Sequence, residues 1–137
     1  MSTMKLAGFN FTKISIEKKK TDLKDLKISS GIHIEEIAEA KTSIKTKESF
    51  LAVKWKFEAV YNPEIAKIEF EGNVLVGLDS KKAKEVLKSW ANKKVEEDFN
   101  LAVINVILRK SNIKALQLED EFGLPAHFKL PSLKAKK

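Results

Sequence analysis

Hydrophobic and polar residues alternate along four segments in the first half of the chain, and this pattern predicts four β-strands. The clearest segment is residues 48–61, where apolar side chains at every second position from Leu51 to Tyr61 share one face. Lysine and glutamate occupy the other face of that segment. Residues 65–78 repeat the alternation, with Gly72 at a point where a bulge or a close backbone approach is expected.

The two segments nearer the N-terminus alternate less regularly. Residues 6–17 change parity near Thr12 and Lys13, which predicts a strand with a bulge. A second strand is predicted within residues 28–45, where the apolar face is expected to hold Ile32, Ile34, Ala38 and Ala40. A lysine-rich connection, residues 18–27, separates these two strands.

Beyond residue 79 the apolar spacing becomes helical. Asp79 suits a helix N-cap, and a short helix is predicted over residues 80–93. A longer helix is predicted over residues 95–122. Gly123 suits the left-handed residue that ends a helix, and Pro125 prevents its continuation.

This order predicts an α+β fold, in which a four-stranded antiparallel sheet is followed by a short and a long helix. There is no internal repeat and no linker, so residues 1–137 are expected to form one domain. Within the long helix, residues 101–108 (LAVINVIL) are apolar on nearly every side, with Asn105 as the exception. A helix of this kind needs two partners, and the second would be another subunit or a ligand.

Composition supports a folded protein with a basic surface. The chain has 43% hydrophobic and 33% charged residues, and 26 basic against 19 acidic residues give a net charge of +7. A basic surface can attract nucleic acid. However, Arg109 is the only arginine, and the lysines occur along the whole chain, so nucleic acid is not the favoured partner.

The sequence lacks the usual signs of secretion and of membrane insertion. It contains no cysteine, which excludes disulfides and thiolate metal sites and fits a cytoplasmic location. No N-terminal apolar run suits a signal peptide, and the longest apolar run is too short to cross a membrane.

Catalytic patterns are also missing. No glycine-rich phosphate loop or nucleophile elbow occurs. Carboxylate clusters suit helix ends and solvated faces. His33 lies in a strand pattern, and His127 lies between two prolines with no evident partner. An enzyme, a cofactor and a metal site are therefore not expected.

The end of the chain resembles that of the SecB family of ATP-independent protein-export chaperones. The long helix ends in Gly123-Leu124-Pro125, and Leu130-Pro131 follows in an extended segment, as in that family. Gly72, in IEFEGNV, is a weaker match, and the predicted order of elements is the same. The chain lacks the cysteine-proline and Pro-Tyr-Ala-Arg stretches of bacterial SecB, and it is basic where bacterial SecB is acidic. Its contact with an export motor is therefore not implied.

The resemblance implies a holdase that binds unfolded client polypeptides in a hydrophobic groove, in a homotetramer built as a dimer of dimers. The loop over residues 18–30 would form a lip of the groove, and residues 132–137 would be a loose basic tail. Groove candidates are Leu23, Leu26, Ile28, Trp55, Phe57, Phe99 and Phe122. Candidates for the oligomer interface are Leu87, Trp90, Ile104 and Leu108.

Two other interpretations stay open on the residues alone. Large aromatic side chains are more often part of a core than of a binding surface. Leucines in a charged loop, such as Leu23 and Leu26, either anchor the loop or form an exposed apolar lip. The alternatives to a chaperone are thus a basic nucleic-acid-binding domain and a structural module whose apolar helix serves only its own oligomer.

Overall fold

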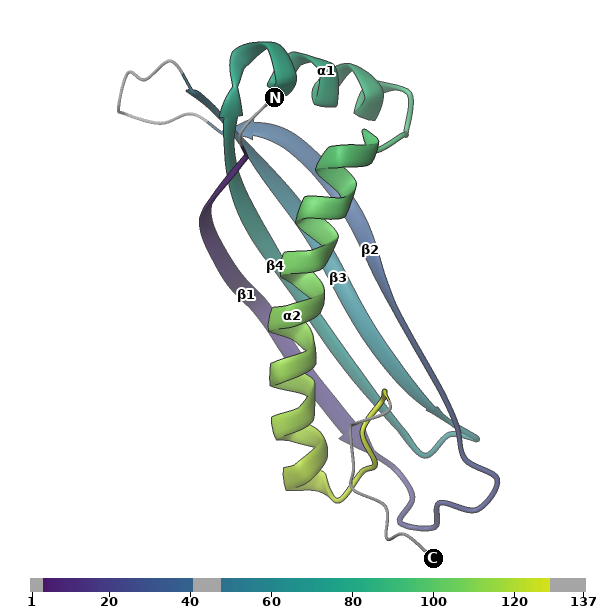
Figure 1. Cartoon of the computed structure of the whole chain (residues 1–137). Helices are drawn as coiled ribbons and strands as arrows, with labels where there is room; N and C mark the ends of the chain where they lie inside the picture. Colours follow the sequence, from purple (N-terminus) through teal and green to yellow (C-terminus); the bar gives the residue numbers. More distant parts are fainter. Residues whose placement is uncertain (1–3, 41–47, 129–137) are drawn as a thin grey trace, which may run out of the picture.

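A computed structural model describes residues 4–40 and 48–128 and confirms the predicted fold class. The elements, in chain order, are β1 (Lys5–Lys18), β2 (Lys27–Ala40), β3 (Glu48–Asn62), β4 (Ala66–Asp79), α1 (Ser80–Ala91) and α2 (Glu97–Phe122). The strands form one antiparallel sheet in the order β1-β4-β3-β2. Both helices lie on one face of it, with α2 along the strands and α1 across one end (Figure 1).

The core lies between this face of the sheet and α2. Paired residues on the two central strands point to the same side, as Phe57 and Phe70 do, and their rings stack at 5.4 Å. Below α2, every second side chain of β3 from Leu51 to Tyr61 is buried. The helix contributes a seam spaced about four residues apart, so that one side of it faces the sheet. The seam consists of Phe99, Val103, Ile107, Ser111, Ala115 and Leu118.

Gly72 marks a close approach, as the sequence predicts. A Cβ atom at this position would lie 2.2 Å from the carbonyl oxygen of Asn10 and 2.6 Å from the ring of Trp55. Trp55 is fully buried there and stacks on Phe9 at 5.3 Å. Only glycine leaves room for both the indole and the backbone of β1.

The bulge predicted in the first strand is confirmed, and a second bulge corrects the prediction for the next strand. The pairing of β1 with β4 shifts between Phe11 and Lys13. In β2 the register shifts between Ile34 and Glu36. The extra residue reverses the parity, so Ile37 enters the core at 4% exposure and Ala38, predicted on that face, is exposed. The structure ends β2 at Ala40, and the rest of the predicted strand lies outside the described residues.

The start of α1 and the end of α2 follow the predicted capping chemistry. Asp79 caps α1, because its Oδ1 accepts a hydrogen bond of 2.8 Å from the backbone N–H of Lys82. Gly123 is left-handed (φ 66°) at the end of α2. The backbone N–H of Leu124 then donates to the carbonyl of Glu119 at 2.8 Å, which completes a Schellman motif.

The other face of the sheet is polar and carries ion pairs. Glu69 accepts from Lys13 at 3.2 Å, and Lys56 and Lys67 approach the same carboxylate within 3.4 Å. The Lys13 hydrogen bond is the main cause that holds the pKa of Glu69 below its usual value, and the hydrogen bond from Lys56 acts the same way.

The positive charge of the chain is not spread evenly, although lysines occur throughout. Seven of the 26 basic residues, and none of the 19 acidic ones, lie in residues 41–47 and 129–137, which are outside the described part. The described residues therefore carry equal numbers of acidic and basic side chains. The described sheet and helices therefore carry no net charge when histidine is neutral.

Candidate functional site

The candidate site is an apolar groove between α2 and β2. The buried seam of α2 faces the sheet, and a neighbouring stripe of the helix faces β2 with Leu101, Ile104 and Leu108. Leu101 is 56% exposed and Leu108 is 38% exposed. Exposed apolar side chains at this spacing leave one side of the helix without cover.

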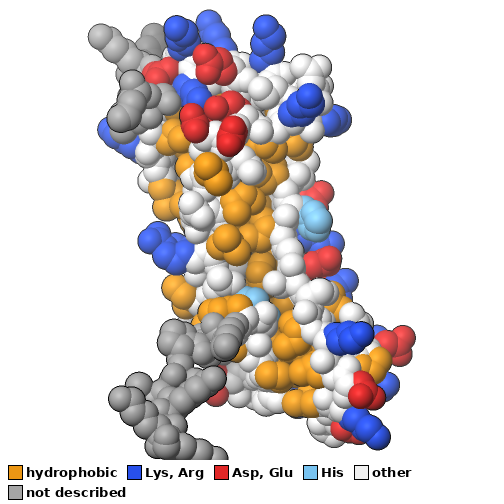
Figure 2. Space-filling view, turned by 45° about the vertical axis from the view of Figure 1, so that its right-hand side comes forward, with side chains coloured by type: hydrophobic (Ala, Val, Ile, Leu, Met, Phe, Trp, Pro, Cys, Tyr) orange, Lys and Arg blue, Asp and Glu red, His pale blue; other side chains and the backbone are white. Residues whose placement is uncertain are grey.

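The groove contains a hollow of about 330 Å³. β2 contributes Ile32, α2 contributes Ile104 and Leu108, and Phe57 of β3 forms part of the floor. The remaining lining residues are Ser30, Gly31, Asn112, His127 and Phe128. Figure 2 shows apolar side chains gathered in a band along this side of the molecule, with charged side chains mainly at its two ends and along one edge.

One end of the groove is built by the C-terminal segment, which a buried polar cluster holds against α2 and β3. Glu119 accepts from the backbone N–H of His127 at 3.0 Å, and its Oε2 lies 2.9 Å from Nδ1 of the same residue. The other ring nitrogen, Nε2, lies 2.7 Å from Oδ1 of Asn112. The side chains of Glu119 and His127 are each 2% exposed.

Tyr61 connects this cluster to the sheet. Its hydroxyl bonds to the carboxylate of Glu119 and lies 2.8 Å from the carbonyl oxygen of Pro125. Burial is the main cause that raises the pKa of the Tyr61 phenol, and the hydrogen bond to Glu119 raises it further, so the hydroxyl keeps its proton at neutral pH. The cluster fixes His127 and its neighbour Phe128 beside the hollow, where their rings lie 4.8 Å apart.

The partner of His127 corrects the sequence analysis, which finds none. The ring is held by Glu119 and Asn112, eight and 15 residues away in the sequence. The chain must turn back after Gly123 for these groups to meet. Glu119 follows Leu118 on the buried side of α2, and a carboxylate at such a position was the one available signal for the cluster.

The predicted groove residues fall into two groups. Trp55 and Phe99 are fully buried in the core, and Phe57 is 1% exposed at the floor of the hollow. The first two therefore offer no contact surface in this chain, in line with the core interpretation of the aromatic residues.

The other groove candidates lie toward the end of the molecule where α2 stops (Figure 1). Leu23 is 36% exposed in the connection between β1 and β2, while Leu26 and Ile28 are half-buried and pack against the core. Phe122 ends α2 and is 36% exposed. Leu23 and Phe122 are thus the two of this group that present substantial apolar surface.

Two of the four predicted interface residues line the groove instead of standing apart from it. Ile104 and Leu108 are on the stripe of α2 that faces β2. Leu87 and Trp90 of α1 are half-buried and pack against the core. Lys93 places its amine 5.7 Å from the centre of the Trp90 ring. Their role in an oligomer stays a prediction.

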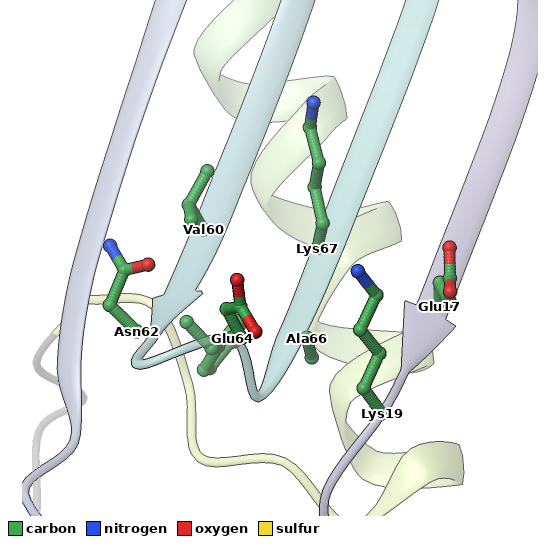
Figure 3. Close-up of a pocket in the computed structure, with 8 residues that line it drawn as sticks. Glu17, Lys19, Val60, Asn62, Glu64, Ala66 and Lys67 are labelled. Carbon is green, nitrogen blue, oxygen red and sulfur yellow. The ribbon is translucent and has the colours of Figure 1, made fainter.

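Two further hollows are smaller. One of about 160 Å³ lies on the opposite side of α2, between β1 and the helix, with Leu6, Ala102 and Val106 in its lining. Another, of about 190 Å³, lies beside the turn between β3 and β4, where Glu17, Lys19 and Lys67 surround Val60 (Figure 3). Opposite charges alternate around that hollow, which favours no particular ligand.

Other kinds of site were sought in the described residues. Within residues 4–40 and 48–128, no group of three or more histidine and carboxylate side chains is placed to hold a metal ion. Among the described helices, none is both long and apolar enough to cross a membrane. The groove is the hollow whose lining joins the exposed apolar stripe of α2 to β2.

Comparisons of the sequence find no match, whereas a comparison of the fold finds similar structures. No family profile matches the chain, and no curated protein sequence matches it. Among solved structures, it is similar to the Mycobacterium tuberculosis SecB-like chaperone Rv1957 in complex with a ChAD peptide from the HigA1 antitoxin Rv1956. The TM-score is 0.53 and the identity 10%, and the match covers 98% of this chain and 93% of that chain. At this identity the likeness establishes a SecB-like fold.

Proposed function

We propose that this protein is an ATP-independent chaperone of the holdase type, which binds non-native polypeptides in the groove between α2 and β2. The observation that carries the proposal is the uncovered apolar stripe of Ile104 and Leu108 beside Ile32 and Phe128. Unfolded chains expose apolar side chains, and their burial gains about 25 cal/mol per Å². The SecB-like fold supports the proposal, because the similar Mycobacterium tuberculosis chaperone was solved with a peptide.

Such a groove suits many different clients. Contacts between apolar side chains are not directional, so no fixed client sequence is needed. Ordering the bound segment offsets part of the gain, at about 1–2 kcal/mol for each backbone residue fixed. One short groove would therefore bind weakly, and several grooves in one assembly would bind a long client more tightly.

The proposed domain organisation, location and oligomeric state follow from the resemblance to the SecB family. We infer that the chain acts as a single domain in the cytoplasm and assembles as a homotetramer, a dimer of dimers. Leu87 and Trp90 are the interface candidates that lie apart from the groove. Client delivery to an export machinery and pairing with an antitoxin are the two roles that such a holdase would serve.

The first experiment follows the light scattering of a reduced, refolding client protein, with and without this protein and without nucleotide. Suppression near one tetramer per client is expected. Leu108→Asp should abolish suppression, because it puts a charge in the groove. Ile113→Asp is the matched control, since Ile113 is an exposed apolar residue (54%) of the same helix, five positions on, and so points to another side.

Three results would separate the alternatives. No suppression with several clients would overturn the holdase proposal. Equal loss in both variants, with the assembly broken on a sizing column, would favour an oligomerisation module. Binding that depends steeply on salt and is competed by nucleic acid would favour the nucleic-acid alternative, because counterion release follows phosphate contacts. Burial of apolar side chains varies little with salt.

A further inference from the structure

The C-terminal segment, residues 124–128, lies on the continuation of the groove floor. Phe57 forms part of the floor of the hollow, and the centre of its ring lies 5.5 Å from that of the His127 ring. The same face of β3 continues to Tyr61, whose hydroxyl lies 2.8 Å from the carbonyl oxygen of Pro125. Figure 1 shows the segment turning back from the end of α2 toward the sheet. The hollow and the segment therefore share one floor, and the hollow ends where the segment begins.

The buried seam of α2 leaves space for this segment. Toward the start of the helix the seam carries Val103 and Ile107, whereas Ser111 and Ala115 follow at the level where the helix contacts His127. Small side chains leave volume between a helix and a sheet, and a close-packed interior needs another group to fill it. The His127 side chain is 2% exposed there. The segment thus fills a part of the layer that a client would otherwise reach.

Polar contacts hold much of the segment in place. Glu119, Asn112 and Tyr61 bond to it, whereas Leu124 is its buried apolar residue. When the segment moves out, these three polar side chains face the opened groove, where water takes over their hydrogen bonds. Such an exchange changes the free energy little compared with the exposure of apolar surface. The segment can therefore leave without stranding a buried polar group.

We propose, on the basis of the function proposed above, that residues 124–128 are a plug that occupies the client's place in the free protein. A client that fits the open hollow leaves the plug where it is. A longer client displaces the plug and lies on the floor from Phe57 to Tyr61. Its backbone N–H groups replace the N–H of His127 at Glu119, which requires no particular client sequence. The plug thereby makes the groove select long unfolded chains over short apolar segments.

The first test follows the plug directly in the full chain, because His33 and His127 are its only histidines. The ring signals of labelled histidine are recorded by NMR with two peptides that alternate leucine and serine. The peptides have about six and about 14 residues, and so span roughly 20 and 46 Å when extended. The long peptide should move the His127 signals to those of a solvated histidine, and the short one should bind without moving them. Exposed His33, which pairs with Lys56 on β3, is the internal reference.

The second test weakens the plug. Asn112→Ala removes the group that bonds to Nε2 of His127. The affinity for the long peptide should rise about three- to tenfold, whereas that for the short peptide should stay within about twofold. Asn105→Ala is the matched control, because exposed Asn105 lies seven positions earlier on nearly the same side of α2 and does not line the hollow. It should change neither affinity.

The outcomes separate the plug from the holdase. The plug is overturned if His127 keeps its signals while the long peptide is bound, or if Asn112→Ala raises both affinities equally, since a more apolar groove alone would do that. It is also overturned if the long peptide does not bind although the chain suppresses client aggregation. In each of these cases the holdase proposal stays intact. Failure of the parent chain to suppress aggregation would overturn both.

Discussion

Oε2 of Glu119 in α2 lies 2.9 Å from Nδ1 of His127 in the C-terminal segment, and both side chains are almost completely buried. Tyr61 and Asn112 occupy the remaining sides of this pair. The polar groups of the cluster satisfy one another, so the segment after α2 is fixed as a wall of the groove.

Replacing His127 should loosen this wall. His127→Ala is expected to lower the free energy of unfolding by about 1–3 kcal/mol, because Glu119 and Asn112 would lose a buried partner. Urea denaturation followed by tryptophan fluorescence measures it. His33→Ala is the matched control, since His33 is the other histidine of the chain and is exposed, and it should change stability by less than about 0.5 kcal/mol. Equal effects would show that the cluster does not hold the segment.

Gly72 should be the least replaceable glycine of the sheet. In Gly72→Ala the new methyl group would lie 2.2 Å from the backbone oxygen of Asn10, so β1 or the Trp55 ring must move. A loss of about 2–4 kcal/mol in the free energy of unfolding is expected. Gly8→Ala is the control, because its nearest contact would be 3.6 Å from Leu75. Thermal unfolding midpoints that fall equally in both variants would contradict the close approach.

The free energy of unfolding should depend on pH in the acid range, because Glu69 loses its charge there. Lys13 and Lys56 hold its pKa below the usual value, so its contribution is present above the unfolded pKa of about 4.3 and is lost as the pH falls through the lower folded value. Glu69→Gln should cost about 0.5–1 kcal/mol at pH 7 and almost nothing near pH 2. Urea denaturation at both pH values checks this. Glu17→Gln is the control, because Glu17 is an exposed carboxylate outside this ion-pair cluster. Its difference in stability from the parent should not shrink between pH 7 and pH 2.

The loop between β1 and β2 should contribute to client binding through Leu23. This side chain is 36% exposed, so Leu23→Asp should leave stability within about 0.5 kcal/mol of the parent. If the loop forms a lip of the groove, suppression of aggregation should weaken several-fold while the assembly stays intact. Thr21→Asp, an exposed neighbour that adds the same charge without removing apolar surface, is the control. Unchanged suppression in Leu23→Asp would exclude the loop from the site.

The periodicity of the sequence predicts the elements well, because burial on one face of a sheet or helix is a local pattern. The alternation from Leu51 to Tyr61 and the capping residues Asp79 and Gly123 are found where they are expected. The bulge in β2 was missed. Ile34, Ala38 and Ala40 have the same parity, so the segment reads as regular alternation unless the partner strand is known.

The site could be predicted only in outline. The all-round apolar character of residues 101–108 indicates a second partner, and Ile104 and Leu108 do face an open hollow. Which aromatic residues form the core depends on contacts far apart in the sequence, such as those between Trp55 and Phe9. The polar cluster around Glu119 joins four positions from three parts of the chain, and no spacing rule brings them together.

The widths of the two layers explain why apolar surface remains beside α2. Four strands spaced about 4.8 Å apart make a sheet nearly 20 Å wide, whereas one helix with its side chains is about 10 Å across. A single long helix can therefore shield only the middle of the apolar face, and a furrow is left along each side of it. Such furrows follow from the number of elements and need no particular residue. Almost any set of apolar side chains would preserve them, so the furrows place little constraint on the sequence.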